Sequence, residues 1–145
     1  MSTRPAGYPL VVPYLMYEDT AAALDWLGKA FGFRERFRHT VEGGRIDHAE
    51  MEIGDGLLML ATPGPGYRSP RSLGGATALV HVYVEDLGAH FERAKASGAV
   101  VRTEPTEKPY GTIQYSVADP EGHLWLFSEQ IREPDPEWRI DSSDR

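Results

Sequence analysis

The chain repeats one pattern of elements, and this repeat limits the folds that the chain can adopt. Residues 10–33 (LVVPYLMYEDTAAALDWLGKAFGF) combine a β-rich run, an acidic corner and a helical stretch that ends at Gly32. Residues 78–101 (ALVHVYVEDLGAHFERAKASGAVV) have the same order, with Glu85-Asp86 as the corner and Gly98 as the stop. Such internal similarity predicts two copies of one supersecondary unit, each of which buries its apolar face with help from the other.

Both helical stretches have clear boundaries and a clear buried face. Asp19-Thr20 and Asp86 are N-cap signals, and the glycines beyond the last turns are C-cap signals. Apolar residues recur at helical spacing, which predicts short amphipathic helices that cover a sheet. The predicted buried positions are Ala23, Leu24, Leu27, Phe31, Leu87, Phe91 and Ala94.

The residues after each helix alternate between polar and apolar and are broken by glycine turns, which predicts strands joined by hairpins. The chain therefore reads as an α+β fold with two tandem βαβββ modules, at about residues 9–62 and 77–130, in a single domain over 1–145. The prolines and glycines of residues 63–76 predict a loop, either a lid carrying Tyr67, Arg68 and Arg71 or a plain linker. The polar tail, residues 131–145, contains Trp138 and is expected on the surface or against a partner.

Composition removes several functional classes. The formal net charge of −7 disfavours nucleic acid and anionic membranes as partners. The chain has no cysteine, so disulfides, thiolate nucleophiles and cysteine-bound zinc are excluded. No apolar run approaches membrane-spanning length, and the first residues do not resemble a secretion signal. We therefore expect a cytoplasmic protein.

The repeated modules resemble a known family. The acidic corner before each helix, the segment GDGLLML in the first module and the segment DPEGHLW in the second are similar to the vicinal-oxygen-chelate superfamily. That superfamily includes glyoxalase I, bleomycin-resistance proteins, fosfomycin-resistance enzymes and extradiol dioxygenases. The resemblance spans about residues 9–130. It implies curved sheets, a ligand cavity between the modules and a homodimer.

The resemblance also implies four places for metal ligands, early in the first strand and within the last strand of each module. These places fall at Val12, at Met59 or Leu60, at Leu79 or Val80 beside His81, and at Trp125 or Leu126. Only the histidine can bind a metal, and a stable site needs about three protein donors. We therefore expect no metal and no other cofactor, although a divalent metal stays as a disfavoured alternative.

A second possible donor set also has a plainer interpretation. His48, Glu50 and Glu52 share one face of a predicted strand, so they could gather around an ion. The same alternation is the ordinary solvated face of an antiparallel sheet, and we favour that interpretation.

Without a metal, the remaining wall of the cavity is aromatic and apolar, which suits flat or amphipathic ligands. His81, Glu50 and Gln114 are the candidate polar anchors. The residues predicted to bind the ligand are Tyr14, Met16, Met59, His81, Tyr83, Gln114, Tyr115 and Trp125.

The leading hypothesis is a metal-free, bleomycin-resistance-like protein that binds a hydrophobic or planar small molecule. The alternative is a lyase, isomerase or oxygenase that uses His81 with His48 or Glu50. A third hypothesis is a structural or regulatory partner protein with an unused cleft.

Overall fold

The computed structural model of the protein describes residues 3–141, and these residues form two modules in sequence. The first module contains β1 (Tyr14–Met16), α1 (Thr20–Phe31), β2 (Arg34–Thr40), β3 (Ile46–Ile53) and β4 (Gly56–Ala61). The second contains β5 (Leu79–Tyr83), α3 (Leu87–Ala96), β6 (Val100–Glu107), β7 (Thr112–Ala118) and β8 (Leu124–Gln130). Between them lies α2 (Pro70–Leu73), and the tail carries the 3-10 turn η1 (Pro136–Trp138).

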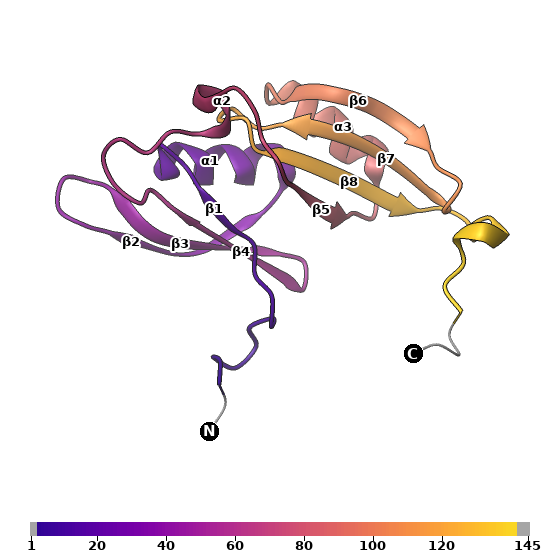
Figure 1. Cartoon of the computed structure of the whole chain (residues 1–145), viewed down its shortest axis with the longest axis horizontal. Helices are drawn as coiled ribbons and strands as arrows, with labels where there is room; N and C mark the ends of the chain where they lie inside the picture. Colours follow the sequence, from indigo (N-terminus) through magenta and orange to yellow (C-terminus); the bar gives the residue numbers. More distant parts are fainter. Residues whose placement is uncertain (1–2, 142–145) are drawn as a thin grey trace.

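Each module builds its own four-stranded sheet, with strand orders β1-β4-β3-β2 and β5-β8-β7-β6. In both sheets the first strand pairs parallel with the last strand, and the remaining neighbours pair antiparallel. The sheets lie beside each other along the long axis of the molecule (Figure 1). The α+β fold with two βαβββ modules is therefore confirmed.

The helices start and end where their capping residues stand. The Asp19 side chain accepts a hydrogen bond from the N–H of Ala22, and the Asp86 side chain accepts one from the N–H of Ala89, both at 3.1 Å. Gly32 ends α1 with φ of 77°, a left-handed conformation that glycine adopts without steric cost. All the positions predicted to be buried on the two helices are buried.

One face of each sheet is covered by its own helix, and the two helices also contact each other. The core between them is largely aromatic and aliphatic, and Phe31 joins the modules by packing against Trp125 and Phe127 with ring centroids 5.4 and 4.7 Å away. Because both helices lie on this side, the opposite face of each sheet is left for other contacts.

The turn between β7 and β8 ties the second module to the first. The Glu121 carboxylate accepts hydrogen bonds from the N–H groups of Glu18 and Asp19 at 2.5 and 3.0 Å, just before α1. A negative charge is favourable there because the N-terminal end of a helix carries a partial positive charge. His123 Nε2 lies 2.7 Å from the carbonyl oxygen of Met16. These bonds fix the modules relative to each other.

The linker is more ordered than its composition predicts. Instead of an irregular loop throughout, residues 70–73 form a helical turn, with Ser69 as N-cap and Pro70 at its start. Proline suits the first helical position because that position needs no N–H donor. The Tyr67 hydroxyl donates to the Met16 carbonyl oxygen at 3.0 Å, and the Arg71 N–H donates to the Glu121 carbonyl oxygen at 2.8 Å. The linker is therefore anchored to both modules.

In the tail, Trp138 packs against Tyr110 with ring centroids 5.0 Å apart and stays 48% exposed. Within residues 3–141, no helix is long and apolar enough to cross a membrane.

Candidate functional site

The face of each sheet opposite its helix carries most of the chemistry, and we call it the open face. Strand alternation assigns the residues, because neighbours along a strand point to opposite faces. On the first sheet the open face carries Tyr14, Met16, Phe37, His48, Glu50, Glu52 and Met59. On the second sheet it carries Leu79, His81, Tyr83, Gln114, Leu126 and Ser128.

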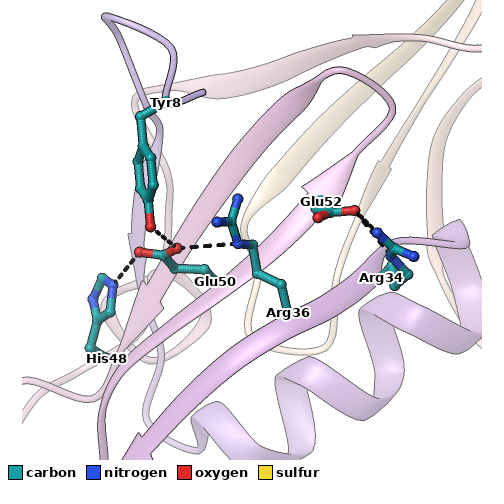
Figure 2. Close-up of polar contacts among 6 residues, drawn as sticks. All are labelled: Tyr8, Arg34, Arg36, His48, Glu50 and Glu52. Atoms are coloured by element: carbon teal, nitrogen blue, oxygen red, sulfur yellow. Dashed lines mark hydrogen bonds and ion pairs between the residues drawn. The ribbon is translucent and has the colours of Figure 1, made fainter. Parts of the chain in front are cut away.

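Glu50 is the centre of a polar cluster on the first open face (Figure 2). Its side chain is almost fully buried, with the residue 6% exposed. Tyr8, from the segment before β1, donates its hydroxyl proton to Glu50 Oε1 at 2.6 Å. His48 Nε2 lies 2.8 Å from Glu50 Oε2, and Arg36 Nε lies 3.6 Å from Oε1. The carboxylate is thus surrounded by donors.

The cluster extends to the edge of the sheet through His48. The His48 Nδ1 atom lies 2.7 Å from the hydroxyl oxygen of Tyr14, and the two rings meet edge to face. On the other side of Glu50, the Arg36 guanidinium lies over the Tyr8 ring, 5.1 Å from its centroid. Cations are attracted to the faces of aromatic rings, so this contact helps to hold the N-terminal segment on the sheet.

These contacts determine which groups carry charge. Burial raises the pKa of the Glu50 carboxyl, but the hydrogen bonds from His48 and Tyr8 and the charge of Arg36 lower it by more, and the pKa ends below its ordinary value. Burial, together with the charges of Asp47 and Glu50, raises the pKa of Tyr14. At neutral pH the cluster therefore holds an ionised carboxylate and a protonated phenol.

A β-bulge shapes this face. The pairing of β2 with β3 matches Glu35 with Met51 and Phe37 with Glu50, so Arg36 is an extra residue on β2. A bulge breaks the strict alternation of side chains. As a result Arg36 contacts Glu50, and Phe37 also reaches the open face, where it lies 6.2 Å from the His48 ring and is 49% exposed.

The second open face has its own hydrogen-bonded group. His81 Nε2 lies 2.8 Å from the hydroxyl oxygen of Ser128, and that hydroxyl donates to Gln114 Oε1 at 3.4 Å. Tyr110 also donates to Gln114 Oε1, at 3.2 Å. Burial lowers the pKa of His81, which favours its neutral form. The Tyr83 ring lies 4.7 Å from the His81 ring and adds apolar surface.

The alternative enzyme hypothesis paired His81 with His48 or Glu50, and the structure places these residues in separate groups. His48 and Glu50 bond to each other on the first sheet. His81 bonds to Ser128 on the second sheet.

Two residues predicted to line the cavity lie elsewhere. Tyr115 and Trp125 are both 0% exposed and pack in the core on the helix side of the second sheet. The Trp125 Nε1–H donates to Asp119 Oδ2 at 3.1 Å, and its ring contacts Phe31 and Phe33. The prediction for Tyr115 was wrong because Gln114 and Tyr115 are adjacent on one strand and must point to opposite faces. The same alternation applies to Trp125 and Leu126 on β8. Leu126, rather than Trp125, reaches the open face.

The other residues predicted to bind the ligand all lie on the open faces. The strand pairing shows which of them lie opposite one another. Tyr14 lies opposite Met59, and His81 lies opposite Leu126. Of the places implied by the family resemblance, Met59 and Leu126 are the alternatives that lie on the open faces, beside Tyr14 and His81. Tyrosine, methionine, histidine and leucine do not make a donor set for zinc, iron or manganese.

Histidine and carboxylate side chains elsewhere in the described residues do not form another metal site. Among residues 3–141, no group of three or more His, Asp and Glu side chains is arranged to hold a metal ion. His48 and Glu50 use their facing atoms on each other and on Tyr8 and Tyr14. The residues present thus do not fit the metal of the metal-dependent family members.

A hollow of about 340 Å³ lies between the modules and contains two predicted binding residues, His81 and Tyr83. It is bounded by the N-terminal segment at Pro9, Val11 and Pro13 and by the turn between β3 and β4. A larger hollow of about 740 Å³ lies beside Arg71 and Arg102, on the side of the linker.

Sequence reasoning missed Tyr8 and Phe37. Tyr8 precedes the first strand and lies 42 positions before Glu50, so no local pattern links them. The bulge brings Phe37 to the open face, and a bulge cannot be read from the sequence of this strand. The one signal for Phe37 was an aromatic residue inside the charged run Arg34–Arg38.

The protein consists of paired βαβββ modules, and the open faces of its two sheets carry aromatic, apolar and a few polar side chains. The chain belongs to the Glyoxalase/Bleomycin resistance protein/Dioxygenase superfamily, whose family model matches residues 10–127. This confirms the family that the sequence resembles.

The chain is also similar to individual proteins. The chain is 36% identical over 130 residues to an uncharacterized protein of Mycobacterium tuberculosis, covering 86% of this chain and 76% of the relative. It is similar to the crystal structure of TioX from Micromonospora sp. ML1, with 38% identity, a TM-score of 0.69, and coverage of 83% of this chain and 97% of TioX. A glyoxalase/bleomycin resistance protein/dioxygenase from Nocardioides, 18% identical, shares the fold with a TM-score of 0.63 over 94% of this chain and 90% of that one.

Proposed function

We propose that the protein binds a hydrophobic or planar small molecule on its open faces without a metal ion, in the manner of bleomycin-resistance proteins. The observation that carries this proposal is the strand pairing of Tyr14 with Met59 and of His81 with Leu126. Of these four side chains only His81 is a common metal donor, and a stable metal site needs about three protein donors. Flat ligands bind such surfaces by burial of area and stacking, with a few polar groups to orient them.

The polar groups on the open faces support ligand orientation. Gln114 and Ser128 hold His81 on the second sheet, and Glu50 and Tyr14 hold His48 on the first. Side chains that are fixed by neighbouring hydrogen bonds bind a ligand with little loss of freedom. We therefore keep His81 and Gln114 as proposed polar anchors, and Tyr14, Met16, Met59 and Tyr83 as the proposed wall. Glu50, also predicted as an anchor, is 6% exposed and bonded to Tyr8 and His48, so we propose that it orients these side chains instead.

We also propose that the protein is a homodimer in which open faces of two copies help to enclose the ligand. Large apolar side chains stay exposed on the strands, and exposed apolar surface of this kind marks interaction sites. These residues are Phe37, Leu79, Tyr83 and Val100. Size-exclusion chromatography with light scattering should give twice the mass of one chain, and a monomer at all concentrations would contradict the dimer. The cytoplasmic location inferred from the sequence stays a prediction.

The experiment that tests the binding function combines metal analysis with ligand extraction. Purified protein should contain no stoichiometric zinc, nickel, manganese or iron, and organic extraction followed by mass spectrometry should release an apolar or planar compound. Ligand binding should survive treatment with a chelator. Stoichiometric metal whose removal abolishes binding would contradict the proposal and favour a metal-dependent enzyme.

A further inference from the structure

The polar cluster on the first open face sets the direction of a chain of hydrogen bonds. An ionised carboxylate can only accept hydrogen bonds. The pKa of Glu50 is lowered by its donors, so its two oxygens accept from their neighbours at neutral pH. His48 Nε2, 2.8 Å from Glu50 Oε2, must therefore carry a proton.

The next bond in the chain follows from the chemistry of imidazole. A neutral imidazole carries one N–H, and its other ring nitrogen is an acceptor. In a neutral His48 ring with its proton on Nε2, Nδ1 accepts, and the Tyr14 hydroxyl at 2.7 Å donates to it. The Tyr14 hydroxyl has one proton, and it is used in the bond to His48. Toward any further partner the Tyr14 oxygen can therefore only accept a hydrogen bond.

Tyr14 is placed to use those lone pairs. It is 42% exposed, in contrast to Glu50, which is 6% exposed and lies beneath Tyr8 and His48. Aromatic surface surrounds it, because the His48 ring lies 5.5 Å from the Tyr14 ring and Phe37 lies beside His48. Met59, directly opposite Tyr14 on β4, adds apolar surface.

From this arrangement we infer that Tyr14 is a dedicated hydrogen-bond acceptor that selects planar aromatic ligands bearing a hydroxyl group, that is, phenol-type compounds. His48 and Glu50 position it and fix its polarity. The inference rests on the proposed small-molecule binding and specifies the chemical class of the ligand. An aromatic compound without a donor, such as a methyl ether, leaves the Tyr14 oxygen desolvated and unpaired.

Tyr83 provides an internal comparison. It is also a tyrosine on an open face and is 67% exposed. Within residues 3–141 its hydroxyl has no hydrogen-bond partner in the structure, so its proton is free to rotate and it can donate or accept. Tyr83 therefore has no reason to discriminate between a phenol and its ether.

The test uses two probes, 2-naphthol and its methyl ether 2-methoxynaphthalene, in which a methyl group replaces the hydroxyl hydrogen, with binding measured by calorimetry at pH 8. Wild-type protein should bind 2-naphthol about tenfold more tightly than the ether, the range expected for one good hydrogen bond. Tyr14→Phe should lose this preference while still binding the ether.

Equal affinity of wild-type protein for the two probes would overturn the inference and leave the proposed binding function standing. An undiminished preference in Tyr14→Phe would overturn it as well. Failure of both probes to bind wild-type protein would contradict the proposed function, and the inference with it.

A second measurement needs no ligand. Nitrogen-15 NMR at pH 8 distinguishes the protonated ring nitrogen of a neutral histidine, and the His48 signals can be assigned by their loss in His48→Gln. We expect the proton on Nε2. A proton on Nδ1 would reverse the Tyr14 bond and overturn the inference.

Discussion

Tyr17 of the first module donates its hydroxyl proton to Asp119 Oδ2 of the second module at 2.7 Å, and both residues are buried. The Trp125 indole N–H donates to the same oxygen, and the N–H groups of Glu121 and His123 donate to Oδ1. Burial, followed by the charge of Asp119 and its hydrogen bond, raises the pKa of Tyr17 well above its ordinary value, so Tyr17 stays a donor. One carboxylate thus satisfies donors from both modules.

Replacing this carboxylate should destabilise the whole protein. Asp119→Ala leaves four donors without their acceptor, and we expect a loss of about 3–5 kcal/mol in the free energy of unfolding. Tyr17→Phe removes one bond and should cost about 1–2 kcal/mol. Urea unfolding measures both. Asp25→Ala is the matched control, because the Asp25 side chain is 85% exposed and its ion pair with Arg38 is long, at 3.9 Å. An Asp119→Ala protein as stable as that control would show that the junction is not held in this way.

Trp125→Ala should act on stability and not directly on the ligand. The indole fills the core between the second sheet and Phe31, so its removal leaves a cavity and should cost about 3–5 kcal/mol. Tyr83→Ala removes an aromatic ring from the open face and should cost less than about 0.5 kcal/mol while weakening ligand binding. Denaturation and 2-naphthol titration of the two variants separate these roles. A stable Trp125→Ala protein that fails to bind the probe would place the indole on the ligand wall after all.

The helices and the fold class could be predicted because their signals are local. Asp19 caps the residue three positions later and Gly32 ends the same helix, so the sequence around them is enough. The face of β8 could not be predicted in the same way. Leu124 to Phe127 are all apolar and give no alternation, and the polar Ser128 on the open face was the one available signal.

The candidate site depended on contacts that sequence patterns do not carry. The bulge at Arg36 moves Phe37 to the open face, and bulges leave no reliable mark in a charged strand. Tyr8 reaches Glu50 from an irregular segment, through a contact that only the folded chain creates. In β7, by contrast, the alternation of Gln114 and Tyr115 was readable and should have placed the tyrosine in the core.

Two glycine substitutions separate backbone strain from steric overlap. Gly122 and Gly43 have similar positive φ angles, 91° and 87°. A Cβ at Gly122 would lie 2.7 Å from the backbone nitrogen of Arg71, whereas a Cβ at Gly43 meets nothing within 4 Å. Gly43→Ala should cost about 1–2 kcal/mol for the left-handed conformation alone. Gly122→Ala should cost at least about 1 kcal/mol more, because it pushes the linker away. Equal losses in thermal unfolding would mean that the linker does not pack on this turn.

The free energy of unfolding should fall as the pH drops below about 6.5, the ordinary pKa of histidine. Burial, and to a lesser extent the charge of Arg93, lowers the pKa of His90, which lies 2.5 Å from the Tyr115 hydroxyl oxygen. As the pH falls, His90 is therefore protonated in the unfolded chain before it is protonated in the folded protein. The contribution of neutral His90 is complete above pH 6.5 and is lost as the pH falls toward the folded pKa, by at most about 1.4 kcal/mol per pH unit.

His90→Gln keeps a polar group at this position but cannot titrate. Its unfolding free energy should depend less steeply on pH between 7.5 and 5.5 than that of wild type, as measured by urea unfolding at a series of pH values. Parallel profiles for the two proteins would exclude His90 as a source of acid sensitivity.

The methionines give the most direct test of ligand binding on the open faces. Met16 and Met59 lie on the first open face, whereas Met51 is 1% exposed on the helix side of the same sheet. In protein labelled with carbon-13 at the methionine methyl groups, titration with 2-naphthol should shift the Met16 and Met59 signals and leave Met51 nearly unchanged. Shifts confined to Met51, or no shift at Met16 and Met59 when the probe binds, would contradict a ligand site on the open face.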